Sequence, residues 1–115
     1  MISHLTNTTF TNGKVVLDIS EWEVVSIQVI GGGGTISLLA TNNPGDVTGV
    51  TDGGALDATD FNAVQAVNLS TGVAVTAVTG TNIFRITPAG FKFLQIGDGS
   101  TATATKVLVF KTKPY

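Results

Sequence analysis

Apolar and polar positions alternate along most of the chain with a period of two. In residues 15–20 and again in 24–30, every second side chain is Val, Leu or Ile, and most of those between are polar. This period is typical of strands with one face toward a core, and no stretch carries an apolar stripe at the helical period of 3.6 residues. The pattern predicts further strands at 36–41, 61–69, 73–78, 83–87, 91–96 and 106–112, with a weak first strand near 8–11.

Turn residues separate the predicted strands. Asn12-Gly13 is a favoured two-residue hairpin sequence, and residues 24–41 are typical of a hairpin whose tip is Gly31-Gly32-Gly33-Gly34. Short strands at close spacing favour an all-β protein: an antiparallel β-sandwich of jelly-roll type with about eight strands. We expect one domain over residues 13–115, preceded by a flexible N-terminal segment over residues 1–12.

Several predicted strands, such as 24–29 and 106–110, are apolar on both faces, although one face of a two-layer sandwich is usually wet. Either these are central strands with some apolar exposure, or their outer faces meet other subunits. Only 12% of residues are charged and the mean hydropathy is +0.36. A surface so poor in charge favours coverage by partner subunits.

The charge distribution narrows the classes of partner. The net charge is -2, and the six Lys and Arg residues are scattered rather than arranged in the basic stripe of a nucleic-acid binder. No apolar run reaches the roughly 20 residues that span a bilayer, so no membrane contact is predicted. The N-terminal residues have neither the basic nor the apolar region of a secretory signal, and we expect the protein to be made in the cytoplasm.

The chain offers few groups for catalysis. It has no cysteine, and its one histidine, His4, lies close to the N-terminus. Glu21 and Glu23 flank Trp22 and could form a carboxylate pair beside a sugar-binding ring, or a solvated pair beside an anchoring one. We therefore predict neither an enzyme nor a cofactor, and we take Trp22 as a candidate interaction residue.

Two loops supply the other candidate interaction residues. A strand, not a helix, follows the four glycines, so a phosphate loop is excluded; glycine there permits positive φ or the close approach of another backbone. The long loop 42–60 carries spaced aspartates that could hold an ion or lie solvated, without the pattern of an EF-hand. The candidates in these two loops are Gly31, Gly32, Gly33, Gly34, Asp46, Asp52 and Asp57.

The order of these features resembles small β-sandwich virion proteins of tailed bacteriophages. An apolar strand at 24–29 is followed by a glycine turn, a strand, and the loop sequence Thr41-Asn42-Asn43-Pro44-Gly45. An Arg-bearing strand, a Gly-containing turn and a further strand follow at 83–96, and a Thr/Ala-rich strand closes the domain at 101–111. The resemblance covers 21–112 and is one of residue types, without a sharp motif.

Such a resemblance implies a passive structural role in a virion. The implied function is capsid decoration or cement, with the major capsid protein or other virion proteins as partners. It also implies a homo-oligomer, often a trimer, made in the bacterial cytoplasm and located in the virion. The alternative is a host-surface or glycan-binding module on a fibre or tail, which an exposed Trp22 would favour.

Overall fold

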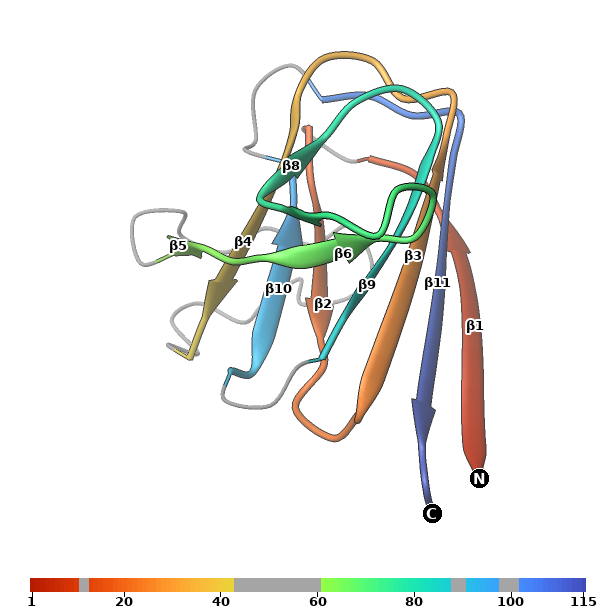
Figure 1. The fold of residues 1–115 in the computed structure, drawn as a ribbon. Coiled ribbons are helices and arrows are strands. Elements are labelled where there is room, and N and C mark those ends of the chain that lie inside the picture. The colour runs from red at the N-terminus through yellow and green to blue at the C-terminus, as the bar shows by residue number, and fades with distance from the viewer. Residues whose placement is uncertain (11–12, 43–60, 88–90, 98–101) are drawn as a thin grey trace.

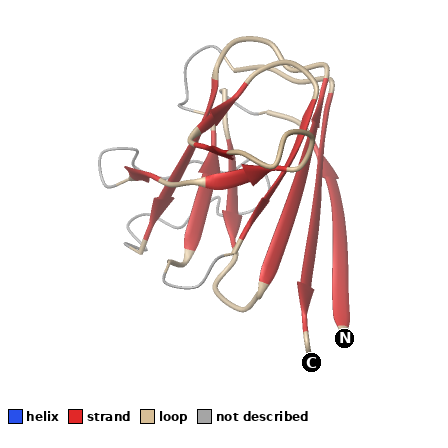
Figure 2. Ribbon diagram, in the orientation of Figure 1, coloured by secondary structure: helices blue, strands red, loops and turns tan. Residues whose placement is uncertain are grey.

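The computed structural model describes residues 1–10, 13–42, 61–87, 91–97 and 102–115. These ranges contain eleven strands and no helix (Figures 1 and 2). The strands are β1 (Ile2–Thr8), β2 (Val15–Asp18), β3 (Val24–Ile30), β4 (Ile36–Thr41), β5 (Asn62–Ala63), β6 (Ala66–Asn68), β7 (Ala74–Val75), β8 (Ala77–Val78), β9 (Asn82–Ile86), β10 (Phe93–Ile96) and β11 (Lys106–Lys113).

The strands form two antiparallel sheets that pack face to face, which confirms the predicted β-sandwich (Figure 1). The larger sheet has the order β1-β11-β3-β9-β6-β7, and the smaller has β2-β10-β4-β5, with β8 also pairing with β4. Pairing is nested: β1 with β11, β2 with β10, β3 with β9, and β4 with β5. A long hairpin rolled up in this way is the topology of a jelly roll.

The described residues form more strands than the predicted eight because two predicted strands each divide between the sheets, and because β1 forms at Ile2–Thr8, where the sequence predicts only a weak strand near 8–11. In the segment 62–68, β5 pairs with β4 of the smaller sheet and β6 pairs with β9 of the larger. Likewise β7 pairs with β6, whereas β8 pairs with β4. Period-two alternation marks extended backbone but does not show where a chain leaves one sheet for the other.

The predicted hairpin over residues 24–41 is wrong. β3 lies in the larger sheet between β11 and β9, and β4 lies in the smaller sheet beside β10. The segment Gly31-Gly32-Gly33-Gly34 therefore connects the two layers of the sandwich. The turn chemistry identified a reversal of the chain correctly, but β3 pairs with β11 and β4 pairs with β10, strands that lie far away in the sequence.

The N-terminal residues form an edge strand where the sequence predicts a flexible segment. β1 pairs with β11 without interruption from Ile2↔Lys113 to Thr8↔Val107. Most β1 side chains are exposed, and only Thr6 and Thr8 are half-buried. The sequence of this strand shows little hydrophobic alternation, because backbone hydrogen bonds to β11, and not buried side chains, hold the strand in the sheet.

The core lies between the sheets. On β3 the inward side chains Val25, Ile27 and Val29 are fully buried, and the outward ones are half-buried. Phe84 on β9 is the largest fully buried side chain, and each such burial contributes about 1.5–3 kcal/mol relative to exposure. The remaining members of the main cluster are Val15, Leu17, Ile19, Ile36, Leu38, Ala66, Val78, Ile86, Leu94, Ile96, Ala102, Val107 and Val109.

A second, smaller cluster lies on the opposite face of the smaller sheet. It consists of buried Val16 and Phe93, with Phe61 packed against them. Consequently β2 buries neighbouring residues on both of its faces, Val15 and Val16, each with no exposed surface. A strand that is buried on both faces carries more apolar residues than simple alternation would require, which explains part of the high apolar content of the chain.

Candidate functional site

The connection between β2 and β3 places the candidate residue Trp22. The Asp18 carboxylate accepts hydrogen bonds from the backbone N–H of Ser20 (3.0 Å) and from its hydroxyl (2.7 Å). The Trp22 N–H donates to the Ile19 carbonyl at 3.1 Å, and the Glu23 N–H donates to a carbonyl of β11 at 2.9 Å. These bonds fix a tight turn, so Trp22 is held against the adjoining end of β11.

The Trp22 ring is half-buried and surrounded by basic side chains from the first and last strands. The Lys113 and Lys111 ammonium groups lie 5.0 and 5.8 Å from the ring centroid, within the range of cation–π attraction. The His4 ring lies 6.2 Å away, tilted by 34°. Since Trp22 also packs against the core cluster, it anchors the end of the sandwich and is not an open platform for a sugar.

The two lysines of this cluster differ in their surroundings. Lys113 lies 4.0 Å from the Glu21 carboxylate, whose side chain is 82% exposed, and a pair this exposed adds at most a few tenths of a kcal/mol. Lys111 is only 8% exposed and faces inward in phase with Val107 and Val109. Its aliphatic stem therefore belongs to the packing beneath the Trp22 ring.

A hollow of about 290 Å³ lies beside this turn. Asp18, Ser20, Glu21 and Trp22 line it. The Asp18 carboxylate is already hydrogen-bonded to Ser20, which leaves the exposed Glu21 carboxylate as the group most open to solvent. Glu23 does not line the hollow. The two glutamates that flank Trp22, Glu21 and Glu23, therefore do not line this hollow together.

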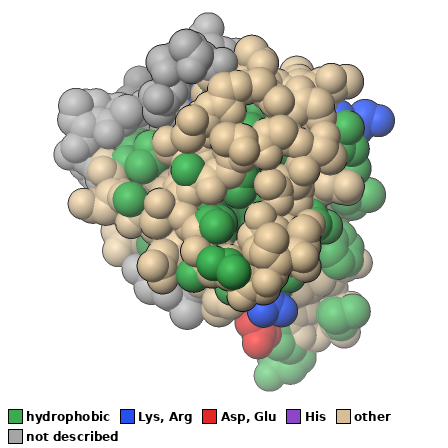
Figure 3. Space-filling model, turned by 45° about the horizontal axis from the view of Figure 1, so that its top comes forward, with side chains coloured by type: hydrophobic (Ala, Val, Ile, Leu, Met, Phe, Trp, Pro, Cys, Tyr) green, Lys and Arg blue, Asp and Glu red, His purple; other side chains and the backbone are tan. Residues whose placement is uncertain are grey.

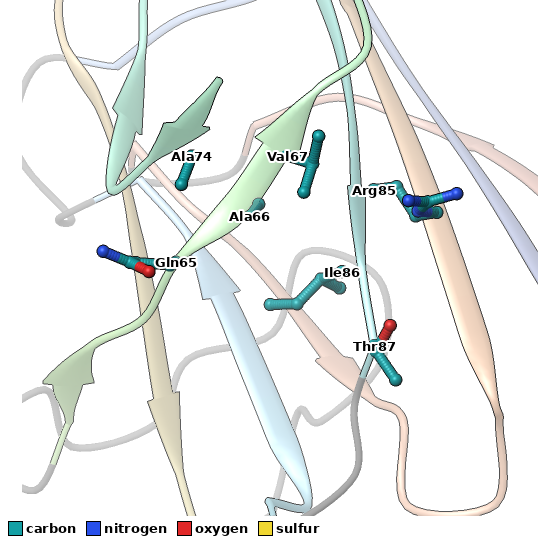
Figure 4. A pocket seen from close by; sticks show the side chains of 7 residues that line it. All are labelled: Gln65, Ala66, Val67, Ala74, Arg85, Ile86 and Thr87. Atoms are coloured by element: carbon teal, nitrogen blue, oxygen red, sulfur yellow. The ribbon is translucent and has the colours of Figure 1, made fainter. Parts of the chain in front are cut away.

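A second hollow, of about 270 Å³, lies at β6, β7 and β9 (Figure 4). Its lining residues are Gln65, Ala66, Val67, Ala74, Arg85, Ile86 and Thr87. The side chains of Gln65 and Arg85 point in opposite directions, away from the small apolar residues between them (Figure 4). Its polar groups therefore do not converge on a common point where one small ligand could be held.

The glycines between β3 and β4 are packed, for the two reasons that the sequence suggests. Gly31 and Gly34 have φ of 66° and 73°, in the region that disfavours other residues. A Cβ on Gly32 would overlap the backbone carbonyl of Gly80, and one on Gly33 would lie 2.5 Å from the Thr103 hydroxyl oxygen. Gly33 and Thr103 also exchange two backbone hydrogen bonds, of 2.9 and 3.1 Å.

The other candidate residues, Asp46, Asp52 and Asp57, lie outside the described residues. Within the described ranges, no three His, Asp or Glu side chains are grouped so that they could hold a metal ion. The same ranges contain no helix long and apolar enough to cross a membrane.

Two groups of apolar side chains are exposed, and of these the sequence pattern indicated only the outer face of residues 106–110. One lies on β1 and β11, where Ile2, Leu5 and Phe110 are 46%, 64% and 43% exposed. The other lies on the β6–β7 hairpin, where Leu69 and Val73 are 43% and 58% exposed. Phe110 alternates with buried Val109 and Lys111. The period of β11 could therefore have placed this phenylalanine on the outer face.

The arrangement of strands defines a jelly-roll β-sandwich. No protein-family model matches the chain, and no curated protein matches it significantly in sequence. A solved structure, that of the SPBc2 prophage-derived protein YomS, is similar to it with a TM-score of 0.61. The similarity covers 96% of this chain and 93% of that one at 12% sequence identity. At this identity the likeness shows a shared fold.

Proposed function

We propose that this protein is a structural component of a bacteriophage virion, and that it decorates and stabilises the assembled capsid. The observation that carries the proposal is the likeness in fold, over nearly the whole of both chains, to a prophage-derived protein. The jelly roll is also an architecture that viral capsid domains use repeatedly. The virion role and the capsid as its location are inferences from this likeness and from the composition.

The β6–β7 hairpin is the surface that we assign to contact with the capsid. Hydrogen bonds close its turn: the Ser70 N–H donates to the Asn68 side chain at 2.9 Å, and the Gly72 N–H donates to the Asn68 carbonyl at 2.7 Å. Leu69 and Val73 stand exposed on either side of it. A turn closed in this way that presents two apolar side chains loses little conformational entropy when it binds.

The proposed mechanism is passive and requires no catalytic group or cofactor. A protein that binds only the assembled shell stabilises the shell by mass action, because disassembly would first have to release it. The low charge of the chain suits this role, since an uncharged surface is readily buried against other subunits.

The glycan-binding alternative has weaker support. Stacking of a sugar needs an accessible aromatic face. Here Lys111, Lys113 and His4 surround the Trp22 ring, which is itself packed on the core. We therefore do not pursue this function further.

The test is sedimentation of the protein with particles from its source lysate on a density gradient. We expect the protein to band with intact particles at a fixed copy number, and Leu69→Ser with Val73→Ser to move it to the top of the gradient. Tyr115→Ser, which removes an exposed hydrophobic side chain elsewhere, is the control and should leave the banding unchanged. A wild-type protein that never bands with particles would overturn the proposal.

A further inference from the structure

Among the sheet edges that the structure describes, the edge formed by β1 lacks protection. An edge strand exposes unpaired backbone groups, and proteins usually shorten it, charge it or interrupt it with proline or a bulge. The other edge strands, β7, β2 and β5, have two, four and two residues. β1 has seven residues, carries no Lys, Arg, Asp, Glu or Pro, and keeps an unbroken register with β11.

The outer face beside this edge is apolar. Leu5 on β1 lies directly opposite Phe110 on β11, and antiparallel partners point to the same face of a sheet. Both side chains are exposed although they belong to the ordered sheet. Figure 3 shows hydrophobic side chains along the right-hand edge of the molecule, the side on which β1 and β11 lie in Figure 1. The unpaired backbone and the apolar pair thus form one continuous surface, which we name the β1 edge.

We propose that the β1 edge binds the β1 edge of a second copy of this chain, strand to strand and antiparallel, about a two-fold axis at Leu5. In this register Leu5 faces the Leu5 of the second copy, Ser3 faces Asn7, and His4 faces Thr6. No pair contains Lys, Arg, Asp or Glu, and the outer face has polar pairs on both sides of a leucine pair.

The arrangement of side chains favours a second copy over an unrelated partner. In the proposed register the apolar row Phe110–Leu5 of one copy continues directly into Leu5–Phe110 of the other, so the two leucines pack side by side between the two phenylalanines. A neutral strand offers no charge by which to select a charged partner strand. The pairing joins two six-stranded sheets into one of twelve strands and leaves no β1 edge free. It therefore predicts a closed dimer in place of the trimer that the virion resemblance implies.

The oligomeric state of the purified full-length chain tests this inference independently of any particle. We expect analytical ultracentrifugation to show a dimer, and Leu5→Lys to raise its dissociation constant at least tenfold, because two ammonium groups would then face each other across the axis. Leu69→Lys introduces the same charge at a site away from this edge and should leave the dimer intact. A monomer at all accessible concentrations, or a trimer, would overturn the proposal.

Disulfide formation tests the register. The chain has no cysteine, so Leu5→Cys and Asn7→Cys each carry a single thiol. Facing residues in an antiparallel pair are close enough for a disulfide, whereas Cα atoms more than 7 Å apart are not. Under mild oxidation we expect Leu5→Cys to form a covalent dimer and Asn7→Cys, which faces Ser3, to stay uncrosslinked. Crosslinking at position 7 and not at 5 would contradict the two-fold axis at Leu5.

Discussion

Substituting Gly32 by alanine distinguishes a packing role for the glycine segment from a role as a free interaction surface. The added Cβ would overlap the carbonyl oxygen of Gly80, and would also lie 3.2 Å from both Ile36 Cδ1 and Val29 Cγ1. The side-chain contacts can relax by small rotations, but the carbonyl belongs to the backbone. Gly32→Ala therefore requires the backbone at Gly32 and the backbone at Gly80 to move apart.

The expected cost follows from overpacking. Forcing an extra carbon into a packed site costs about 1–3 kcal/mol, and a backbone contact places this case in the upper half of that range. Alanine gains about 0.4–1 kcal/mol through the less flexible unfolded chain. The net expectation is a loss of about 1–2.6 kcal/mol. For 115 residues, an unfolding entropy near 0.24 kcal/mol/K makes this a fall in Tm of about 4–11 °C.

The assay is thermal unfolding followed by circular dichroism, with Gly72→Ala as the matched control. Gly72 has φ of 74° but open space around the position of a Cβ. Its substitution by alanine therefore costs only the strain of a left-handed backbone conformation, about 1–2 kcal/mol. The gain from the less flexible unfolded chain, about 0.4–1 kcal/mol, again offsets part of this cost. We expect Gly32→Ala to lower Tm by more than Gly72→Ala does. An unchanged Tm for Gly32→Ala would refute the packing role and return the segment to the candidate interaction surfaces.

Substitutions at three further positions test the packing of buried side chains, each by urea unfolding. Lys111→Met should lower the free energy of unfolding by less than about 1 kcal/mol, because methionine keeps the buried aliphatic stem. Lys111→Ala removes the stem and should lower the free energy of unfolding by more than that. Equal losses for the two variants would instead show that the ammonium group over the Trp22 ring supplies the stability. Gln95 is fully buried, and its amide donates to the Gly97 carbonyl at 2.8 Å while its Oε1 has no partner among the described residues. Gln95→Met should therefore lower the free energy of unfolding by no more than about 1.5 kcal/mol. Gln95→Glu buries a charge and should lower it by about 3 kcal/mol or more at neutral pH. Equal stability of the two variants would contradict this reasoning. Trp22→Ala should lower the free energy of unfolding by about 2–3 kcal/mol, as expected for the loss of a half-buried ring, and Trp22→Phe should keep most of that stability. Unchanged stability of Trp22→Ala would show that the ring does not anchor this end of the sandwich.

Strands with one fully buried face could be predicted from the sequence almost to the residue. β3 and β4 occupy the predicted ranges, and β9, β10 and β11 differ from prediction by at most two residues at either end. Their alternation is strong because every inward side chain enters the core. The weak first strand was predicted near 8–11, whereas β1 covers Ile2–Thr8; both of its faces are largely exposed, so hydrophobic alternation could not place it.

The pairing of strands could not be predicted from local signals. A glycine turn shows that the chain reverses, but whether it returns to the same sheet depends on which other strands compete for the edge. The surroundings of Trp22 show the same limit. The tryptophan itself was identified from the sequence, but His4, Lys111 and Lys113 come from the two ends of the chain and meet at the ring only because β1 pairs with β11.

The pairing of the first strand with the last has a consequence for synthesis. β11 lies between β1 and β3 and supplies a backbone partner to both. Until residues 106–113 have left the ribosome, the two earlier strands have no common neighbour, and the edges that β11 later fills stay open to other chains. Contacts between such distant residues form slowly, and open edges aggregate. Stalling or truncation before residue 106 should therefore yield aggregates, not a smaller sandwich, and the yield of soluble protein should depend on completing this last strand.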